Sequence, residues 1–275
     1  MSAGSIGPFR VVSKGGRGGA GVVYRCLDPA GREVAVKLLD RGATKEQLSR
    51  FGTEVQALLR IRHPNVVRLL DSGEEEGSPF LVMEWVDGET LQQRLERGGP
   101  LAAREAAELC LVLARAVEHL HGQGVLHRDL NPQNVLLRAG TPMITDFGLA
   151  KDQLQGSPTA STRGRGLGTP AYWPPEQARG QLDAIGPASD VYGLGGVLFS
   201  CLTGLPPHRG ETLLEQIAAP ERGPALPPPL RERVERRVDP RLWAICLRAL
   251  EPAPAARQPS ARALAEDLEG WLRQA

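Results

Sequence analysis

The most informative segment of this sequence sets a carboxylate, an amide and a second carboxylate at fixed intervals. The segment reads His127-Arg128-Asp129-Leu130-Asn131-Pro132-Gln133-Asn134, and Asp146-Phe147-Gly148 follows twelve residues after its last Asn. Residues 135–137 and 143–145 are short apolar runs, and the residues between them favour a turn. The sequence therefore predicts a β-hairpin with the acidic residues at its rim.

The side chains of this segment suit one kind of chemistry. Transfer of a phosphoryl group needs a carboxylate that orients a hydroxyl, and oxygen ligands for metal ions. Asp129, Asn134 and Asp146 fit these roles, because hard cations such as Mg²⁺ take carboxylate and amide oxygens together with phosphate. Each residue alone is commonly a cap or turn residue, so the prediction depends on their order and spacing.

Glycine-rich residues 15–21 follow a strand-like run near the start of the chain, and Gly16, Gly18 and Gly21 fit the pattern G-x-G-x-x-G. A dinucleotide site would need these glycines to open a helix, whereas residues 22–27 are β-branched and alternating. A strand-loop-strand flap over phosphates is therefore predicted, because backbone N–H groups approach phosphate closely where no Cβ intervenes. A flexible hairpin without a ligand is the alternative.

Lys37 ends the next predicted strand, Val34-Ala35-Val36-Lys37, and its compact ammonium suits phosphate. Residues 44–60 then carry apolar side chains at spacings of three and four, which predicts a helix. Glu54 lies beside the apolar face of that helix, where a carboxylate is costly unless it meets a cation. A solvated glutamate is the alternative.

Composition restricts the classes of partner. The chain has 33 basic and 32 acidic residues, so no overall field draws it to nucleic acid or to an anionic membrane. No apolar run approaches the ~20 residues of a membrane helix, and residues 1–8 lack the regions of a signal peptide, which favours a cytoplasmic protein. The four cysteines form no C-x-x-C pair, so buried reduced thiols are expected.

The remaining residues predict further strands and helices. Strands are expected at residues 66–70 and 80–83 around an acidic turn at 73–78. Thr90 can cap a helix over residues 91–97, and a longer buried helix is expected over 101–122. The Pro-rich residues 220–229 are expected to form a loop, and residues 231–237 a solvated face of mixed charge.

Together these motifs resemble those of the eukaryotic-type (Hanks-type) serine/threonine protein kinases, and the Ala, Arg, Gly and Pro bias resembles the bacterial members. The matching patterns are H-R-D-L-x-x-x-N with D-F-G, G-x-G-x-x-G-x-V completed by Val23, and the strand that ends at Lys37. The resemblance covers residues 9–272. It implies a bilobal α+β fold, with a small, mostly β lobe that has one helix over residues 9–84 and a larger, mostly α lobe over residues 85–272.

The resemblance also implies the site residues, with ATP and Mg²⁺ as cofactors. The catalytic residues are then Asp129, Asn131, Lys37 and Glu54, with Lys37 paired to Glu54, and the metal ligands are Asn134 and Asp146. The residues implied to bind ATP are Gly15, Gly16, Arg17, Gly18, Gly19, Ala20, Gly21, Val22, Val23, Ala35, Lys37, Met83, Glu84, Val86 and Leu136. Within that set, Met83 guards the back of the adenine pocket, and Glu84 and Val86 offer main-chain groups.

Residues 149–171 have no periodicity and are expected to form a mobile loop. The loop leads into Gly168-Thr169-Pro170, which resembles serine/threonine kinases more than tyrosine kinases, and Thr169 is then expected to line the site of the substrate hydroxyl. The resemblance implies that Glu176 forms a buried pair with Arg257. Phosphate on hydroxyls in the loop could pair with Arg128; the candidates are Thr159, Ser161 and Thr162.

The sequence departs from the family pattern at Asn131, because kinases of this pattern usually have a lysine there that neutralises the transferring phosphate. The predicted function is a serine/threonine protein kinase that transfers the γ-phosphoryl group of ATP to protein hydroxyls and phosphorylates itself. The alternative is a pseudokinase, a nucleotide-binding regulatory scaffold with weak or no catalysis. A small-molecule phosphotransferase is disfavoured by Thr169 and Arg257.

Overall fold

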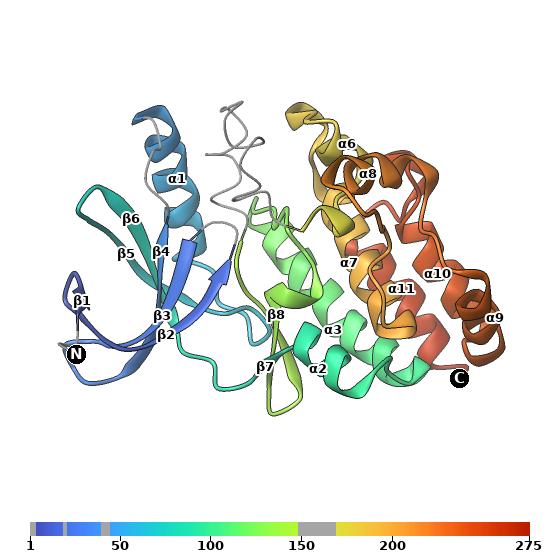
Figure 1. Cartoon of the computed structure of the whole chain (residues 1–275), viewed down its shortest axis with the longest axis horizontal. Coiled ribbons are helices and arrows are strands. Elements are labelled where there is room, and N and C mark those ends of the chain that lie inside the picture. Colours follow the sequence, from blue (N-terminus) through green and yellow to red (C-terminus); the bar gives the residue numbers. More distant parts are fainter. Residues whose placement is uncertain (1–3, 19–20, 40–44, 148–168) are drawn as a thin grey trace. The chain divides into compact units, whose positions relative to one another are not determined.

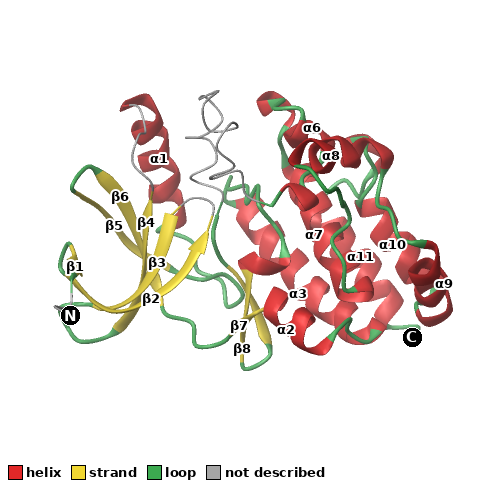
Figure 2. Cartoon of the chain, viewed as in Figure 1, coloured by secondary structure: helices red, strands yellow, loops and turns green. Residues whose placement is uncertain are grey.

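A computed structural model describes residues 4–18, 21–39, 45–147 and 169–275 of the chain (Figure 1). These residues belong to two compact units. The first contains the described residues up to Asp87, and the second runs from Gly88 to Phe147 and from Thr169 to Ala275. The first unit is mostly β and the second mostly α (Figure 2), as the sequence predicted.

The first unit is built on a six-stranded antiparallel sheet with the strand order β1-β2-β3-β4-β6-β5. Its elements are β1 (Ser5–Ile6), β2 (Phe9–Gly18), β3 (Gly21–Leu27), β4 (Glu33–Leu39), α1 (Lys45–Leu58), β5 (Leu69–Glu75) and β6 (Ser78–Glu84). The predicted helix after Lys37 is α1, which buries Phe51, Val55 and Leu58 at the spacing expected of an amphipathic helix.

One face of this sheet forms a core. Successive side chains of a strand point to opposite faces, and alternate residues of β3, β4 and β6 pack together on this one. The cluster consists of Ile6, Phe9, Cys26, Val34, Val36, Phe80 and Val82. Phe9 and Phe80 meet edge to face, with ring centroids 6.0 Å apart, a geometry that aromatic rings favour. The intervening residues of the same strands are left for the opposite face.

The second unit is helical, with one small sheet in the order β7-β8-β9. Its first elements are β7 (Glu89–Thr90), α2 (Leu91–Gly98), α3 (Ala103–Gly122), β8 (Val135–Arg138) and β9 (Thr141–Ile144). Its later helices are α6 (Pro175–Ala178), α7 (Pro187–Thr203), α8 (Leu213–Ala218), α9 (Pro228–Arg237), α10 (Pro240–Ala249) and α11 (Ala261–Leu272). Every residue of α7 from Ser189 onward is buried, so this helix is the core around which α3, α10 and α11 pack.

Several local predictions are confirmed. Thr90 caps α2 in a capping box with Gln93, and β8 and β9 form the expected hairpin. All four cysteines are buried free thiols.

Among the described residues, no helix is both long and apolar enough to cross a membrane.

Other predictions were wrong in their boundaries. β5 begins at Leu69 rather than at residue 66, because a turn in which Val66 N–H donates to His63 C=O (3.2 Å) precedes it. The acidic residues Glu74 and Glu75 lie in β5, so the turn is shorter than predicted. The Pro-rich segment is not wholly a loop, since α9 begins at Pro228; proline at the first helical turn loses no intrahelical hydrogen bond.

Candidate active site

A single buried carboxylate holds the segment that carries Asp129. Asp190, in the first turn of α7, accepts the backbone N–H of His127 at 2.8 Å and that of Arg128 at 2.7 Å. Its Oδ2 also lies 2.8 Å from Nε2 of His121 in the last turn of α3. Arg128 has φ +63°, which is unfavourable for a residue with a side chain. The bonds to Asp190 therefore stabilise a strained backbone directly before Asp129.

The charge of Asp190 suits this role. Burial pushes the pKa of this carboxyl upward, but the hydrogen bond from His121, the electrostatic influence of the two histidines and the backbone N–H of His127 outweigh it, so its pKa is lowered. Asp190 is 2 % exposed. A buried carboxylate that accepts several hydrogen bonds is a strong, fixed anchor.

Two amide side chains contact Asp129. Nδ2 of Asn131 lies 2.9 Å from the main-chain oxygen of Asp129 and 3.2 Å from its Oδ1. Nδ2 of Asn134 donates to the same main-chain oxygen at 2.8 Å. In addition, Oδ1 of Asn131 accepts the N–H of Gln133 at 2.9 Å and so caps the short 3-10 turn Pro132–Asn134. The loop around Asp129 is thus fixed by its own polar side chains.

The predicted hairpin brings Asn134 and Asp146 to the same end of two paired strands. Val135 pairs with Ile144, and the N–H of Thr145 donates to the main-chain oxygen of Asn134 at 3.0 Å. Asp146 has φ +58°, a left-handed conformation that aspartate adopts more readily than most residues. Because Nδ2 of Asn134 is used by Asp129, the amide oxygen remains as the atom that suits a hard cation.

His127 joins the two halves of this site. It is fully buried, and its Nε2 lies 2.9 Å from the main-chain oxygen of Thr145. Its ring centroid is 5.2 Å from that of Phe147, the neighbour of Asp146. The segments that carry Asp129 and Asp146 are therefore connected through one buried imidazole.

The donor set fits a metal that is shared with phosphate. In the described part of the chain, no group of three or more His, Cys, Asp or Glu side chains is arranged to hold a metal ion. Asn134 and Asp146 supply one amide and one carboxylate, and Mg²⁺ commonly takes one or two protein groups together with phosphate oxygens and water.

In the first unit, the described residues of the glycine-rich segment form the two predicted strands, at the end of β2 and the start of β3. Gly21 has φ +148°, and a Cβ there would lie 2.1 Å from the oxygen of Leu38, so the sheet itself requires this glycine. A Cβ on Gly16, in contrast, would meet nothing within 4 Å among the described residues. The protein's own packing does not explain Gly16, whereas a ligand close to the backbone would. Gly19 and Ala20 lie outside the described residues.

The sheet register places the other implied nucleotide residues together. Val23 pairs with Lys37, and Ala35 pairs with Met83, so these four residues share the face opposite the core. Val22, which pairs with Leu38, lies on the face of the sheet that carries the core. Lys37 is buried, at 7 % exposed, and Glu54 is half-buried on α1. Burial of an ammonium is costly unless a counter-charge or a ligand compensates it.

The remaining predicted residues are placed as follows. Arg17 and Gly18 end β2. The N–H of Glu84 donates to Arg68 C=O at 3.0 Å, and Glu84 pairs with Val34 at the end of β6. Val86 is buried in the first unit, and Leu136 is half-buried on β8 of the second. Thr169 is half-buried next to the 3-10 turn Pro170–Tyr172.

The expected pair of Glu176 and Arg257 is confirmed. The guanidinium meets the carboxylate through two hydrogen bonds of 2.8 and 2.9 Å, and both side chains are buried. Burial acts to raise the pKa of Glu176, but the hydrogen bonds and charge of Arg257 lower it overall. Arg257 also lies over the ring of Tyr192, 4.8 Å from its centroid. This pair fixes the segment that follows Thr169.

Sequence reasoning gave no role to Asp190 or His121. Asp190 lies more than sixty residues from His127 and Arg128, whose N–H groups it accepts, and His121 contacts Asp190, so no local spacing signals either residue.

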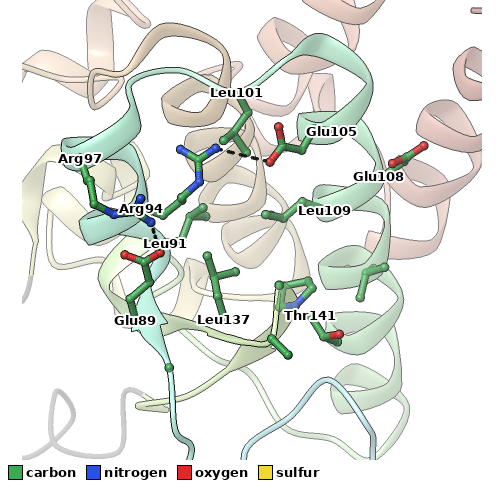
Figure 3. Close-up of a pocket in the computed structure, with 15 residues that line it drawn as sticks. Glu89, Leu91, Arg94, Arg97, Leu101, Glu105, Glu108, Leu109, Leu137 and Thr141 are labelled. Carbon is green, nitrogen blue, oxygen red and sulfur yellow. Dashed lines mark hydrogen bonds and ion pairs between the residues drawn. The ribbon is translucent and has the colours of Figure 1, made fainter.

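A separate cavity of about 740 Å³ lies within the second unit (Figure 3). Its rim carries ion pairs between Arg97 and Glu89, 2.5 Å, and between Arg94 and Glu105, 3.8 Å. None of the described residues that line it belongs to segment 127–134.

Comparisons with known proteins show which family the chain resembles over its length. Residues 9–267 match the family described as "Protein kinase domain". The chain is 36 % identical over 273 residues to the serine/threonine-protein kinase pkn3 of Myxococcus xanthus, covering 95 % of the chain and 49 % of that protein. It is 37 % identical over 281 residues to PkaA of Streptomyces coelicolor, covering 94 % and 48 %.

A solved structure shows the same fold. The crystal structure of Rad53 1-466 in complex with AMP-PNP superposes with a TM-score of 0.77 at 24 % identity, covering 96 % of the chain and 65 % of that structure. The chain spans about half the length of pkn3 and PkaA.

Proposed function

The chain belongs to the protein kinase family, and from this premise we propose that it is a serine/threonine protein kinase. It transfers the γ-phosphoryl group of ATP to hydroxyl groups of proteins, including its own. The names of its relatives support the serine/threonine class. The sequence Gly168-Thr169-Pro170 supports the same class, because it resembles the serine/threonine form of this segment.

One observation carries the proposal: the backbone on both sides of Asp129 is fixed by buried hydrogen bonds. Asp190 holds the residues before it, and the side chains of Asn131 and Asn134 hold the residue itself. Catalysis of phosphoryl transfer depends chiefly on positioning and charge stabilisation. A loop held so firmly is suited to orient a hydroxyl group.

The side chains then divide the work. Asp129 orients the acceptor hydroxyl and takes its proton. Asn134 and Asp146 hold Mg²⁺, which, when bound, neutralises phosphate charge. Lys37 binds phosphate with support from Glu54, and the main-chain N–H groups of residues 15–21 approach phosphate from the flap. Val23, Ala35 and Met83 offer an apolar face to the base.

A second candidate is the pseudokinase, and Asn131 is the observation that favours it. Its amide lacks the positive charge that the resembling kinases usually have at this place. The two functions differ in whether bound ATP is turned over.

We propose that the protein acts in the cytoplasm, because all four cysteines are free thiols and a reducing compartment keeps thiols in that state. Self-phosphorylation is proposed at Thr159, Ser161 or Thr162, which lie outside the described residues.

Two measurements test the proposal with purified protein. ATP with Mg²⁺ should raise the Tm of the wild type and of Asp129→Ala by similar amounts, because Asp129 serves the acceptor and not the nucleotide. Labelled phosphate should transfer to protein only with the wild type. Stabilisation by ATP without any transfer in the wild type would support the pseudokinase instead.

A further inference from the structure

Both ends of the Asn131 side chain are engaged within its own loop. Its Oδ1 caps the 3-10 turn by accepting Gln133 N–H at 2.9 Å. Its Nδ2 has two hydrogens and two acceptors within reach, the main-chain oxygen of Asp129 at 2.9 Å and Oδ1 of Asp129 at 3.2 Å. The residue is 1 % exposed. Asn131 is thus an integral part of the loop and not a free group that extends toward a ligand.

The contact to Oδ1 is the informative one. A cap needs only the amide oxygen, and serine or aspartate would cap the turn equally well. The amide nitrogen makes an additional bond to the carboxylate of the residue that is predicted to act on the hydroxyl. A carboxylate can rotate about its Cβ–Cγ bond, and a donor fixed on one oxygen restricts that rotation.

We propose that Asn131 is a positioning residue that sets the orientation of the Asp129 carboxylate for transfer to a protein hydroxyl. This inference rests on the proposed function. In that reaction the hydroxyl oxygen bonds to the γ-phosphorus, the bond between that phosphorus and the bridging oxygen of ADP breaks, and the hydroxyl proton passes to Asp129. Asn131 acts on this step through Asp129 and does not contact phosphate.

The matched variants are Asn131→Ser and Asn131→Asp. Both retain an oxygen that can cap the turn, so the fold should persist. Serine has no NH₂ group and a shorter side chain, so it loses the amide bond to Oδ1, and aspartate replaces that donor with an oxygen of like charge. Gln133→Ala is the control, because the Gln133 side chain is exposed and its backbone N–H is retained.

The expected kcat order is wild type, then Asn131→Ser, then Asn131→Asp. The serine variant should lose about 10-fold and the aspartate variant about 10²-fold or more, since a misplaced catalytic group can cost 10²-fold. The KM for ATP and the Kd for ATP with Mg²⁺ should stay at wild-type values in all variants, and Gln133→Ala should match the wild type throughout. The Tm should fall in both Asn131 variants, and most in Asn131→Asp, because its carboxylate is buried beside that of Asp129, so kcat is measured below the lowest Tm.

Several outcomes separate the two claims. If the side chain at position 131 only caps the turn, then asparagine, serine and aspartate should serve equally well. Equal kcat values in an active wild type and in both variants would therefore overturn the inference, while the proposed function would stand. A rise in the KM for ATP in proportion to the loss of kcat would also overturn it, because Asn131 would then act on the nucleotide. A wild type without any transfer would overturn the proposed function itself.

Discussion

Asp190→Asn tests how the catalytic loop is held. The carboxylate accepts two backbone N–H groups, at 2.8 and 2.7 Å, and lies 2.8 Å from Nε2 of His121. Asparagine has nearly the same volume, so the change leaves no cavity. It replaces one accepting oxygen with an NH₂ group, which then faces a backbone N–H or the imidazole and leaves a donor without an acceptor.

The magnitude follows from the bonds that are lost. Hydrogen bonds to a charged group contribute about 1.5–3 kcal/mol each, and a buried donor left unsatisfied costs about 1–3 kcal/mol. Replacing one oxygen and the charge should therefore lower the free energy of unfolding by roughly 2–4 kcal/mol. Arg128, at φ +63°, should relax toward a commoner conformation and displace Asp129. A kcat loss of about 10²-fold is expected from that displacement.

The assay compares urea unfolding and kcat in Asp190→Asn and in the control Asp183→Asn, which changes an exposed carboxylate in the same unit. The control should stay within about 0.5 kcal/mol of the wild type, as surface substitutions usually do. If Asp190→Asn matched the control in both stability and kcat, Asp190 would not be the anchor described above.

Three further predictions concern other parts of the structure. Burial lowers the pKa of His208 to about 4, below the ~6.5 of an unfolded histidine, so the unfolded state gains the proton first and stability falls as pH drops from 6.5 to 4. In unfolding curves measured across this range, His208→Gln should reduce the change in the free energy of unfolding between pH 6.5 and pH 4 by roughly 3 kcal/mol. An unchanged pH dependence would show that His208 is not the group responsible. Arg257→Met leaves the charge of Glu176 buried without its partner and should lower the free energy of unfolding, measured in urea, by about 3–5 kcal/mol. Replacing both residues with apolar ones should restore most of that stability. An Arg257→Met protein as stable as the wild type would contradict this prediction. Gly21→Ala should lower the Tm because its Cβ would clash with the neighbouring strand, whereas Gly16→Ala should keep the Tm and weaken ATP binding; the reverse pattern would refute a ligand role for Gly16.

Local signals explain what the sequence predicted correctly. The Thr90 cap and the hairpin of β8 and β9 depend on residues a few positions apart, so short patterns specify them. The buried pair of Glu176 and Arg257 was predicted only through the family resemblance, since 81 residues separate its members. The boundary of β5 was missed because buried residues such as Val66 occur in turns as well as in strands.

The candidate site was predicted as a set of residues but not as a geometry. Spacing alone placed Asp129, Asn134 and Asp146 near one another, and the strand pairing explains why. Spacing did not indicate that Asp190 anchors the loop, or that the Asn131 amide bonds to the Asp129 carboxylate. These contacts depend on helix packing and side-chain rotamers, which a single sequence does not specify. The pairing of Lys37 with Glu54 and the ATP contacts stay predictions.

Transfer of labelled phosphate from γ-labelled ATP, measured in the wild type beside Asp146→Asn, shows whether the chain is a metal-dependent kinase. Asparagine is nearly isosteric with aspartate but removes the carboxylate that the metal needs. We expect Mg²⁺-dependent label on serine or threonine residues of the wild type, located by mass spectrometry, and only background label in a variant of similar Tm. Equal labelling of the two proteins, or a wild type that binds ATP with Mg²⁺ and transfers nothing, would contradict this expectation.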